Sequence, residues 1–465
     1  MAQENPTKNL DTRAGDIKKF EIIGNKTNTS KRPFVDVSAG VVEITYYESI
    51  LANTTSLKVV IVDTGNKKGN GEDKEVITKG LLDELPIRGG EECRLEIVDA
   101  KANPNTLTFK DDNALYVNRV LPIGSEVHRE VIELHLCPKE LLSNEQTRVV
   151  KRYNGKISDS VGSILRDVLE VKKDIIVDPT LISYNFIGND RKPLYVCTWL
   201  ASKSVPEKSG KKNAAAGYFF YETYSGFNFR SIDGLFDQKY KRNGKEVSYL
   251  KKYLYNEQAT LPESGDYDES ILNYSIERNI DLHQNLTLGT YSNRSIFFDF
   301  YSSKYREREY SYDDYQKEGI KIAGRDDIDF VADEFRKPVS RLMNHVLDVG
   351  TLPPGKDATE QLKNWKNTPF DPTFDATNTL VQSIMRYNQI FSIKINITIA
   401  GDFSLRAGDL IYCDFPHITG GGGKTEVNEQ SGGIYLISSL CHRITPSDTY
   451  TSLTLVRDSF GRKPF

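Results

Sequence analysis

The chain has 465 residues, with 61 lysines and arginines against 65 aspartates and glutamates and a formal net charge of -4. This length predicts about three domains of roughly 150 residues each, and the charge balance excludes a globally basic surface of the kind that binds nucleic acid. The N-terminus is polar and mixed in charge, and no run approaches the ~18 apolar residues of a membrane span. We therefore expect a soluble chain that is not exported.

The cysteines and histidines form no recognisable ligand set. The five cysteines are widely scattered and odd in number, and the six histidines show no pair at metal-ligand spacing. We expect the cysteines to be small buried residues in a reducing compartment. The sequence therefore predicts no disulfide framework, no metal site and no cofactor.

Residues 1–175 predict a first antiparallel β-barrel domain that ends in a helix. Apolar residues alternate with polar ones or form short apolar runs at 17–23, 42–46, 57–62, 93–97 and 132–136. Downstream, Ser158 is a candidate helix cap. The apolar stripe of this helix is expected to dock on the preceding barrel, and its members are Val161, Ile164, Leu165, Val168 and Leu169.

Residues 176–375 form a middle region with less regular patterns. Residues 195–200 resemble a strand, and an aromatic hairpin is predicted at 217–232, where Phe227 and Phe229 share one face. With Tyr221, these rings are candidate interface anchors or, more commonly, packed core residues. The segments 239–255 and 281–319 combine many tyrosines with both signs of charge. We expect a peripheral α+β part here that is solvated or faces a partner, and binding of single-stranded nucleic acid is the alternative.

Residues 376–465 predict a closing β-barrel domain preceded by a helix. Leu380, Val381, Ile384 and Met385 have helical spacing, with Asp375 or Thr377 as caps. In residues 391–399 every odd position is apolar, which is typical of a half-buried strand. Three more strands are expected at 409–415, 433–440 and 451–456, and together they predict a small antiparallel barrel or sandwich.

The two predicted barrels share a short signature. Residues 87–91 read Ile-Arg-Gly-Gly-Glu and residues 405–409 read Leu-Arg-Ala-Gly-Asp, and each opens a strand that carries a cysteine soon after the acid. Five residues can match by chance, so coincidence and a repeated domain both remain open here. If the domain is repeated, three chains would present six similar units in a ring.

Two stretches resemble a known family. They are RYNQIFSIKINITIAGDFSLRAGDLIYCDFP at 386–416, with GGIYLISSLCHRIT and YTSLTLVRDSFGRK after it, and GYFFYETYSGFNFRSIDGLF at 217–236. They are similar to baseplate hub proteins of contractile-tailed, T-even-type phages, especially those infecting cyanobacteria, and to the hub part of VgrG proteins. About half of the chain is covered well.

The resemblance implies a mainly β fold with two similar tail-tube-like barrels, each with an associated helix. It further implies a structural homotrimer that joins the hexameric tail tube to the trimeric central spike. Its other neighbours would be the surrounding wedge proteins of the baseplate and the genome DNA passing through its lumen, with no membrane partner. The protein would belong to the virion tail, assembled in the host cytoplasm.

A lumen through which DNA passes should be polar or acidic, because lysine and arginine would hold the phosphates back. Glu43, Glu96 and Glu133 occupy outward strand positions and are candidate lumen-facing acids. Ordinary exterior surface is the alternative location for all three.

Two other functions compete with this one. A cell-wall-degrading enzyme of the tail tip would use paired carboxylates, and Asp326, Asp327 and Asp329 are clustered. Acid clusters are usually solvated surface, and no nucleophile elbow or phosphate-binding loop is present, so we expect no catalytic residues. A VgrG-type secretion tip would continue into a repeat-rich β-helix. The sequence stops nine residues after Val456, so we expect any spike to be a separate polypeptide.

Overall fold

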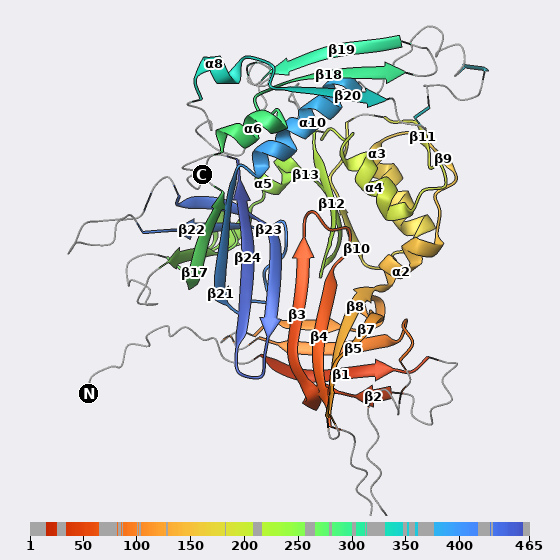
Figure 1. Ribbon diagram of the computed structural model, residues 1–465, viewed down its shortest axis with the longest axis vertical. Coiled ribbons are helices and arrows are strands. Elements are labelled where there is room, and N and C mark those ends of the chain that lie inside the picture. The colour runs from red at the N-terminus through yellow and green to blue at the C-terminus, as the bar shows by residue number, and fades with distance from the viewer. Residues whose placement is uncertain are drawn as a thin grey trace, which may run out of the picture.

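The computed structural model is mainly β (Figure 1). It describes residues 15–25, 34–64, 81, 85, 87–99, 101, 104–126, 129–181, 183–207, 216–255, 266–278, 281–299, 304–311, 313, 331–346, 351–352, 359–360, 376–416, 428 and 431–458. One extended sheet of fourteen strands contains the strands of both predicted barrels, and smaller sheets and helices surround it. Among the described strands only the second of these units closes into a barrel, and the first is an open sheet.

The first unit follows the predicted alternation. Its strands lie in the order β2-β1-β5-β7-β8-β4-β3, with β6 beside β5. Alternate side chains from these strands enter one apolar core, because successive residues of a strand point to opposite faces. The strands are β1 (Asp16–Ile23), β2 (Phe34–Asp36), β3 (Val41–Ser49), β4 (Ser56–Asp63), β5 (Glu92–Val98), β6 (Thr106–Phe109), β7 (Leu115–Glu126) and β8 (Arg129–Pro138).

The second unit is a closed barrel of six strands, in the cyclic order β22-β16-β17-β21-β24-β23. The predicted strands of the closing domain appear as β21 (Ile393–Ala400), β22 (Leu410–Asp414), β23 (Gly433–Ile444) and β24 (Thr449–Arg457). Its other strands, β16 (Lys252–Tyr255) and β17 (Glu269–Arg278), lie in the predicted middle region. The barrel therefore draws on residues well outside 376–465.

Residues 149–229 supply most of a second apolar core, so the middle region of the structure begins within the predicted first domain. It contains α2 (Lys139–Gln146), α3 (Ile157–Ser163), α4 (Pro193–Ala201), α5 (Ile232–Phe236) and a sheet of β10 (Asp174–Val177), β12 (Tyr218–Thr223) and β13 (Gly226–Ser231). Short ladders join β9 (Arg152–Tyr153) to β11 (Phe186–Ile187) and β14 (Tyr240–Arg242) to β15 (Lys245–Val247). The predicted aromatic hairpin is present as β12 and β13.

Three expectations for this region were wrong. The helix at 157–168 packs on the middle core and not on the first barrel. Ser158 lies inside its first turn, where it bonds with Thr180, while Lys156 is the N-cap. Residues 195–200 belong to helix α4 and not to a strand, since Pro193 supplies a helix-compatible first turn.

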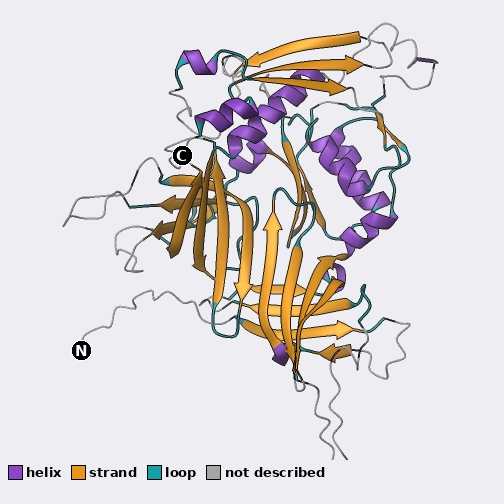
Figure 2. Ribbon diagram, in the orientation of Figure 1, coloured by secondary structure: helices purple, strands orange, loops and turns teal. Residues whose placement is uncertain are grey.

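The predicted helix before the closing barrel is α10 (Ala376–Ile390). Thr377 lies inside it, and Asp375 lies outside the described residues. It packs between the middle core and a peripheral sheet formed by β18 (Ser292–Asp299), β19 (Lys304–Ser311) and β20 (Arg341–Val346). Figure 2 shows α10 and α6 (Leu282–Leu288) between the second barrel and this small sheet, with α8 (Asp333–Arg336) beside one end of the sheet. No helix of the described parts is long and apolar enough to span a membrane.

Candidate functional site

The shared signature forms the same turn in both units. In the first, the Glu91 carboxylate accepts hydrogen bonds from the backbone N–H groups of Arg88 and Gly89 at 2.8 and 2.9 Å. Gly90 has φ +84° and donates its N–H to the carbonyl of Val117 on β7 at 2.7 Å. Glycine adopts this left-handed backbone without a steric cost, so the turn can deliver the chain directly into β5.

The second turn repeats two of these three contacts. Asp409 accepts from the backbone N–H of Arg406 at 2.8 Å, again three residues back, whereas the N–H of Ala407, the counterpart of Gly89, donates to Glu48 of β3. Gly408 has φ +94° and donates to the carbonyl of Ile437 on β23 at 2.8 Å. The five-residue match is therefore a match of structure.

The strand pairings around the two turns are also equivalent. After its turn, the first unit has the order β5-β7-β8-β4-β3, and the second has β22-β23-β24-β21-β17. Register shifts fall at corresponding places, directly after Val117 on β7 and Ile437 on β23, and directly after Val41 on β3 and Ile271 on β17. The chain thus holds two copies of one five-stranded arrangement, joined where β3 pairs with β23.

Eight strands of the two units make one uninterrupted sheet, β7-β8-β4-β3-β23-β24-β21-β17. Its outward face carries small polar side chains over the second unit, and a hollow of about 440 Å³ lies there over β17, β21, β24, β23 and β3. Alternate residues of these strands are among those that line the hollow, and they include Tyr47, Asn273, Ser275, Asn396, Thr398, Ser439, Cys441, Ser452 and Thr454. We call the whole outward face of these eight strands the sheet face.

Ion pairs neutralise most of the charge on the sheet face. Glu43 pairs with Arg443 at 2.9 Å, and Glu133 pairs with Lys58 at 2.9 Å. These hydrogen bonds from cationic groups lower the pKa values of both glutamates. Lys394 likewise pairs with Glu277 of β17 at 2.7 Å. The structure therefore brings two of the three predicted acids onto one face, but each lies beside a cation.

The third acid lies elsewhere. Glu96 is on β5, where it pairs in register with β1 and β6, and β5 is outside the eight strands of the sheet face. The location of these three acids in an assembled particle stays a prediction.

The predicted aromatic residues are buried within the chain. Phe227 and Phe229 have no exposed surface and belong to the middle core. Tyr221 is 2% exposed and belongs to a third apolar cluster, between the hairpin and the second barrel. In this chain all three are packing residues, which leaves them little surface for an interface.

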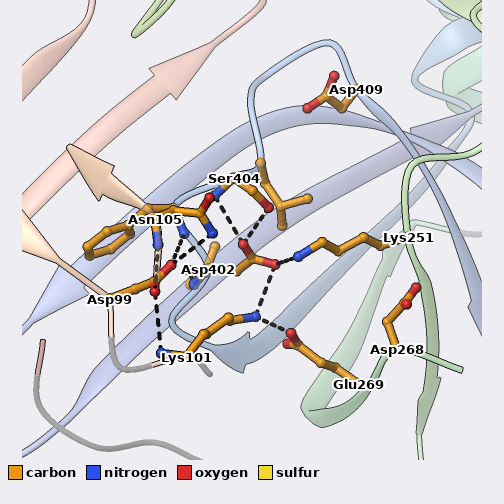
Figure 3. A network of polar contacts seen from close by, with 12 residues as sticks. Asp99, Lys101, Asn105, Lys251, Asp268, Glu269, Asp402, Ser404 and Asp409 are labelled. Carbon is orange, nitrogen blue, oxygen red and sulfur yellow. Dashed lines mark hydrogen bonds and ion pairs between the residues drawn. The ribbon is translucent and has the colours of Figure 1, made fainter. Parts of the chain in front are cut away.

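A buried ionic network holds the two units together (Figure 3). Asp402, in the loop after β21, has no exposed side chain and contacts the ammonium groups of Lys251 and Lys101, the latter at 3.1 Å. Lys101 follows β5 of the first unit and also contacts Glu269 at the start of β17. Burial alone would raise the pKa of Asp402, but the two ammonium groups outweigh it and hold that pKa well below its usual range.

A second buried carboxylate lies where three parts of the chain meet. Glu48 of β3 is 2% exposed and accepts hydrogen bonds from the backbone N–H groups of Tyr224 and Ala407 at 2.7 and 2.9 Å. Burial raises its pKa. Its partners belong to the aromatic hairpin and to the second repeated turn, so this side chain fixes both against the first unit.

The middle region has its own buried charge cluster. Lys173 contacts Glu222 at 2.6 Å and Glu140 at 3.2 Å, and all three side chains are under 10% exposed. Burial raises the pKa of Glu222 to about 7, against the opposing effect of Lys173. These contacts join β12 to the first unit through α2, which starts directly after β8.

The described residues show no group of three or more metal-ligating side chains. All five cysteines are free, and burial raises their pKa values. The aspartate cluster at 326–329 lies outside the described residues.

Comparison with known proteins gives matches in structure only. No protein-family model and no curated protein sequence matches the chain. A tail protein from Neisseria meningitidis is 9% identical, with a TM-score of 0.47 and coverage of 96% of this chain and 97% of that one. A 43 kDa tail protein of a prophage of Shewanella oneidensis is 10% identical, with a TM-score of 0.48 and coverage of 96% of this chain and 99% of that one. A type VI secretion component of E. coli is also 10% identical, with a TM-score of 0.40 and coverage of 96% of this chain and 79% of that one.

Proposed function

We propose that this chain is a structural hub protein of a phage baseplate that works as a trimeric ring. The observation that carries the proposal is the internal repeat, in which two equivalent units are joined edge to edge by β3 and β23. Three such chains in a closed ring present six similar units. A ring of this kind can meet a six-fold tail tube on one side and a three-fold central spike on the other.

The partners and location follow from this role. The tail tube protein, the spike and the surrounding wedge proteins would contact the ring in the virion tail, and assembly would take place in the host cytoplasm. We assign no catalytic residue to the chain. A secretion tip of the VgrG type would use the same ring and differs in the apparatus that it serves.

In this ring the sheet face lines the channel. Its polar side chains and paired charges suit the passage of DNA. Most lysines and arginines of this face lie beside a glutamate, which weakens their attraction for the DNA phosphates. Arg119 of β7 adds a further positive charge to the face. The channel would therefore be close to neutral, which differs from a strictly acidic lining.

The neutralising pairs give a first prediction. In the double variant Glu43→Gln/Glu133→Gln, Arg443 and Lys58 lose their acidic partners, so each ring gains six positive charges in its channel. We expect its affinity for linear double-stranded DNA to rise about ten-fold or more at low salt, with a steeper salt dependence. Fluorescence anisotropy with a labelled duplex measures this.

The matched control is Glu92→Gln/Glu96→Gln on β5. It changes the charge equally and also removes the partner of an arginine, Arg94, but it lies off the sheet face. The assigned lining is wrong if this control strengthens DNA binding as much as the first pair of changes does.

A further inference from the structure

The outermost strands of the sheet face, β7 and β17, are each paired along only part of their outer edge. β7 pairs with β5 only at Leu115 and Tyr116, and β17 pairs with β16 only over residues 269–271. Among the described strands, the later residues of β7 and β17 have no ladder partner on that edge. Open edges present unpaired N–H and C=O groups that can template another strand.

The junction within the chain shows how such edges can pair. The matched registers make β17 the counterpart of β3 and β7 the counterpart of β23. At the junction, β3 and β23 are antiparallel, with Tyr46 opposite His442 and Tyr47 opposite Cys441. Each open edge is therefore the second copy of an edge that is already joined once within the chain.

Carried across the repeat, this register assigns residue pairs. Tyr46 corresponds to Ile276 and Tyr47 to Glu277, while His442 corresponds to Pro122 and Cys441 to Leu121. We propose that β17 of one copy of this chain pairs antiparallel with β7 of the next copy, with Ile276 opposite Pro122 and Glu277 opposite Leu121. This inference rests on the proposed ring and names the edges that would close it.

Burial supports a second copy as the occupant. Tyr46 and His442, which face each other at the internal junction, have no exposed surface. Ile276, the counterpart of Tyr46, is 49% exposed. Pairing the edges would cover this apolar surface as the internal junction covers Tyr46.

Charge and hydrogen bonding are compatible with this pairing. Arg119 would lie on the diagonal from Glu277 of the neighbouring copy, within reach of an ion pair across the strands. Pro122 has no N–H, so this junction has one donor fewer than a ladder of ordinary residues. The remaining backbone groups supply the pairing, as in other cases of strand addition.

Cysteine cross-linking tests the register. The variant Leu121→Cys/Glu277→Cys, in a Cys441→Ser background, is oxidised at a concentration at which the unmodified chain is assembled. Directly opposed residues of antiparallel strands have Cβ atoms about 4.5–5.5 Å apart, close enough for a disulfide after small adjustments. We expect non-reducing gels to show a ladder that ends at a covalent trimer.

The matched control is Arg119→Cys/Glu277→Cys, which moves one cysteine by two residues on the same face. We expect little cross-linking, because the diagonal separation of about 7–8 Å is too long. Equal cross-linking of both variants would overturn the register. A native trimer that gives no cross-linked product would overturn the edge assignment and leave the proposed function standing, whereas a chain that never assembles would overturn both.

Discussion

Asp402→Asn is expected to destabilise the protein by about 3–5 kcal/mol, because it removes a fully buried carboxylate that two partly buried lysines share. Lys251 and Lys101 both contact Asp402, which has no exposed surface. The asparagine keeps the shape and an acceptor for Ser404, which bonds to Asp402 through its N–H and its hydroxyl. The change therefore removes charge more than packing, and chemical denaturation measures the cost.

The pH dependence of this effect has a definite sign. Because the folded protein holds the pKa of Asp402 below its ordinary value of 3.8, the carboxylate contributes its full stability above that value. The contribution falls as the pH drops below 3.8 towards the folded pKa. The difference between the wild type and Asp402→Asn should therefore narrow in acid.

A matched control is Asp333→Asn on α8. Asp333 also pairs with two cations, Arg336 and Lys337, but its side chain is 60% exposed. Water solvates these charges when the acid is removed, so no measurable change in stability is expected. The buried network would not have the assigned role if both substitutions had equal effects.

Gly408→Ala is expected to cost on the order of 3–4 kcal/mol, because it combines backbone strain with a clash. Gly408 has φ +94°, and a Cβ atom there would lie 2.3 Å from the hydroxyl oxygen of Tyr221. Tyr221 is buried and cannot move away freely. The midpoint of urea denaturation should fall accordingly.

The repeat provides the control for this change. Gly90 is the equivalent glycine of the first turn, with φ +84°, but a Cβ atom there meets nothing within 4 Å. Gly90→Ala should therefore cost only the backbone strain, about 1–2 kcal/mol. Equal losses in the two variants would show that the contact with Tyr221 contributes nothing.

The strands with alternating side chains could be predicted because each has one face in a core. In β21 the side chains of Ile393, Ile395, Ile397 and Ile399 are all buried, as the period of two requires. Two strands of the same barrel gave no such signal. β16 has four residues and pairs parallel with both neighbours. A strand this short has too few residues to show an alternating pattern, and its place in the barrel comes from backbone hydrogen bonds.

Helix α4 was wrongly predicted as a strand at residues 195–200. Most of its nine residues are apolar, and Leu194, Val196, Cys197 and Leu200 are all buried. A helix enclosed on most sides has no polar stripe to display its period. A short apolar run of this kind cannot be assigned to helix or strand from the sequence alone.

The candidate site was only partly predictable. The five-residue signature marked the repeated turn, since the turn needs a left-handed glycine and an acid in fixed positions. Elsewhere the two units match in the register of their strand pairing and not in residue type. For example, Glu43 corresponds to Asn273 and Tyr46 to Ile276. Backbone pairing tolerates such changes, so the two units share little sequence. The sheet face could be recognised only after the strands were paired.

The most direct test of the proposed ring is the mass of the purified chain, measured by light scattering after size exclusion over a wide range of concentration. One chain has a mass of 52.6 kDa, and the proposed assembly predicts about 158 kDa, three times that value, with a ring visible by negative-stain electron microscopy. A mass of a single chain at every concentration, unchanged when a trimeric spike protein is added, would contradict the proposed function.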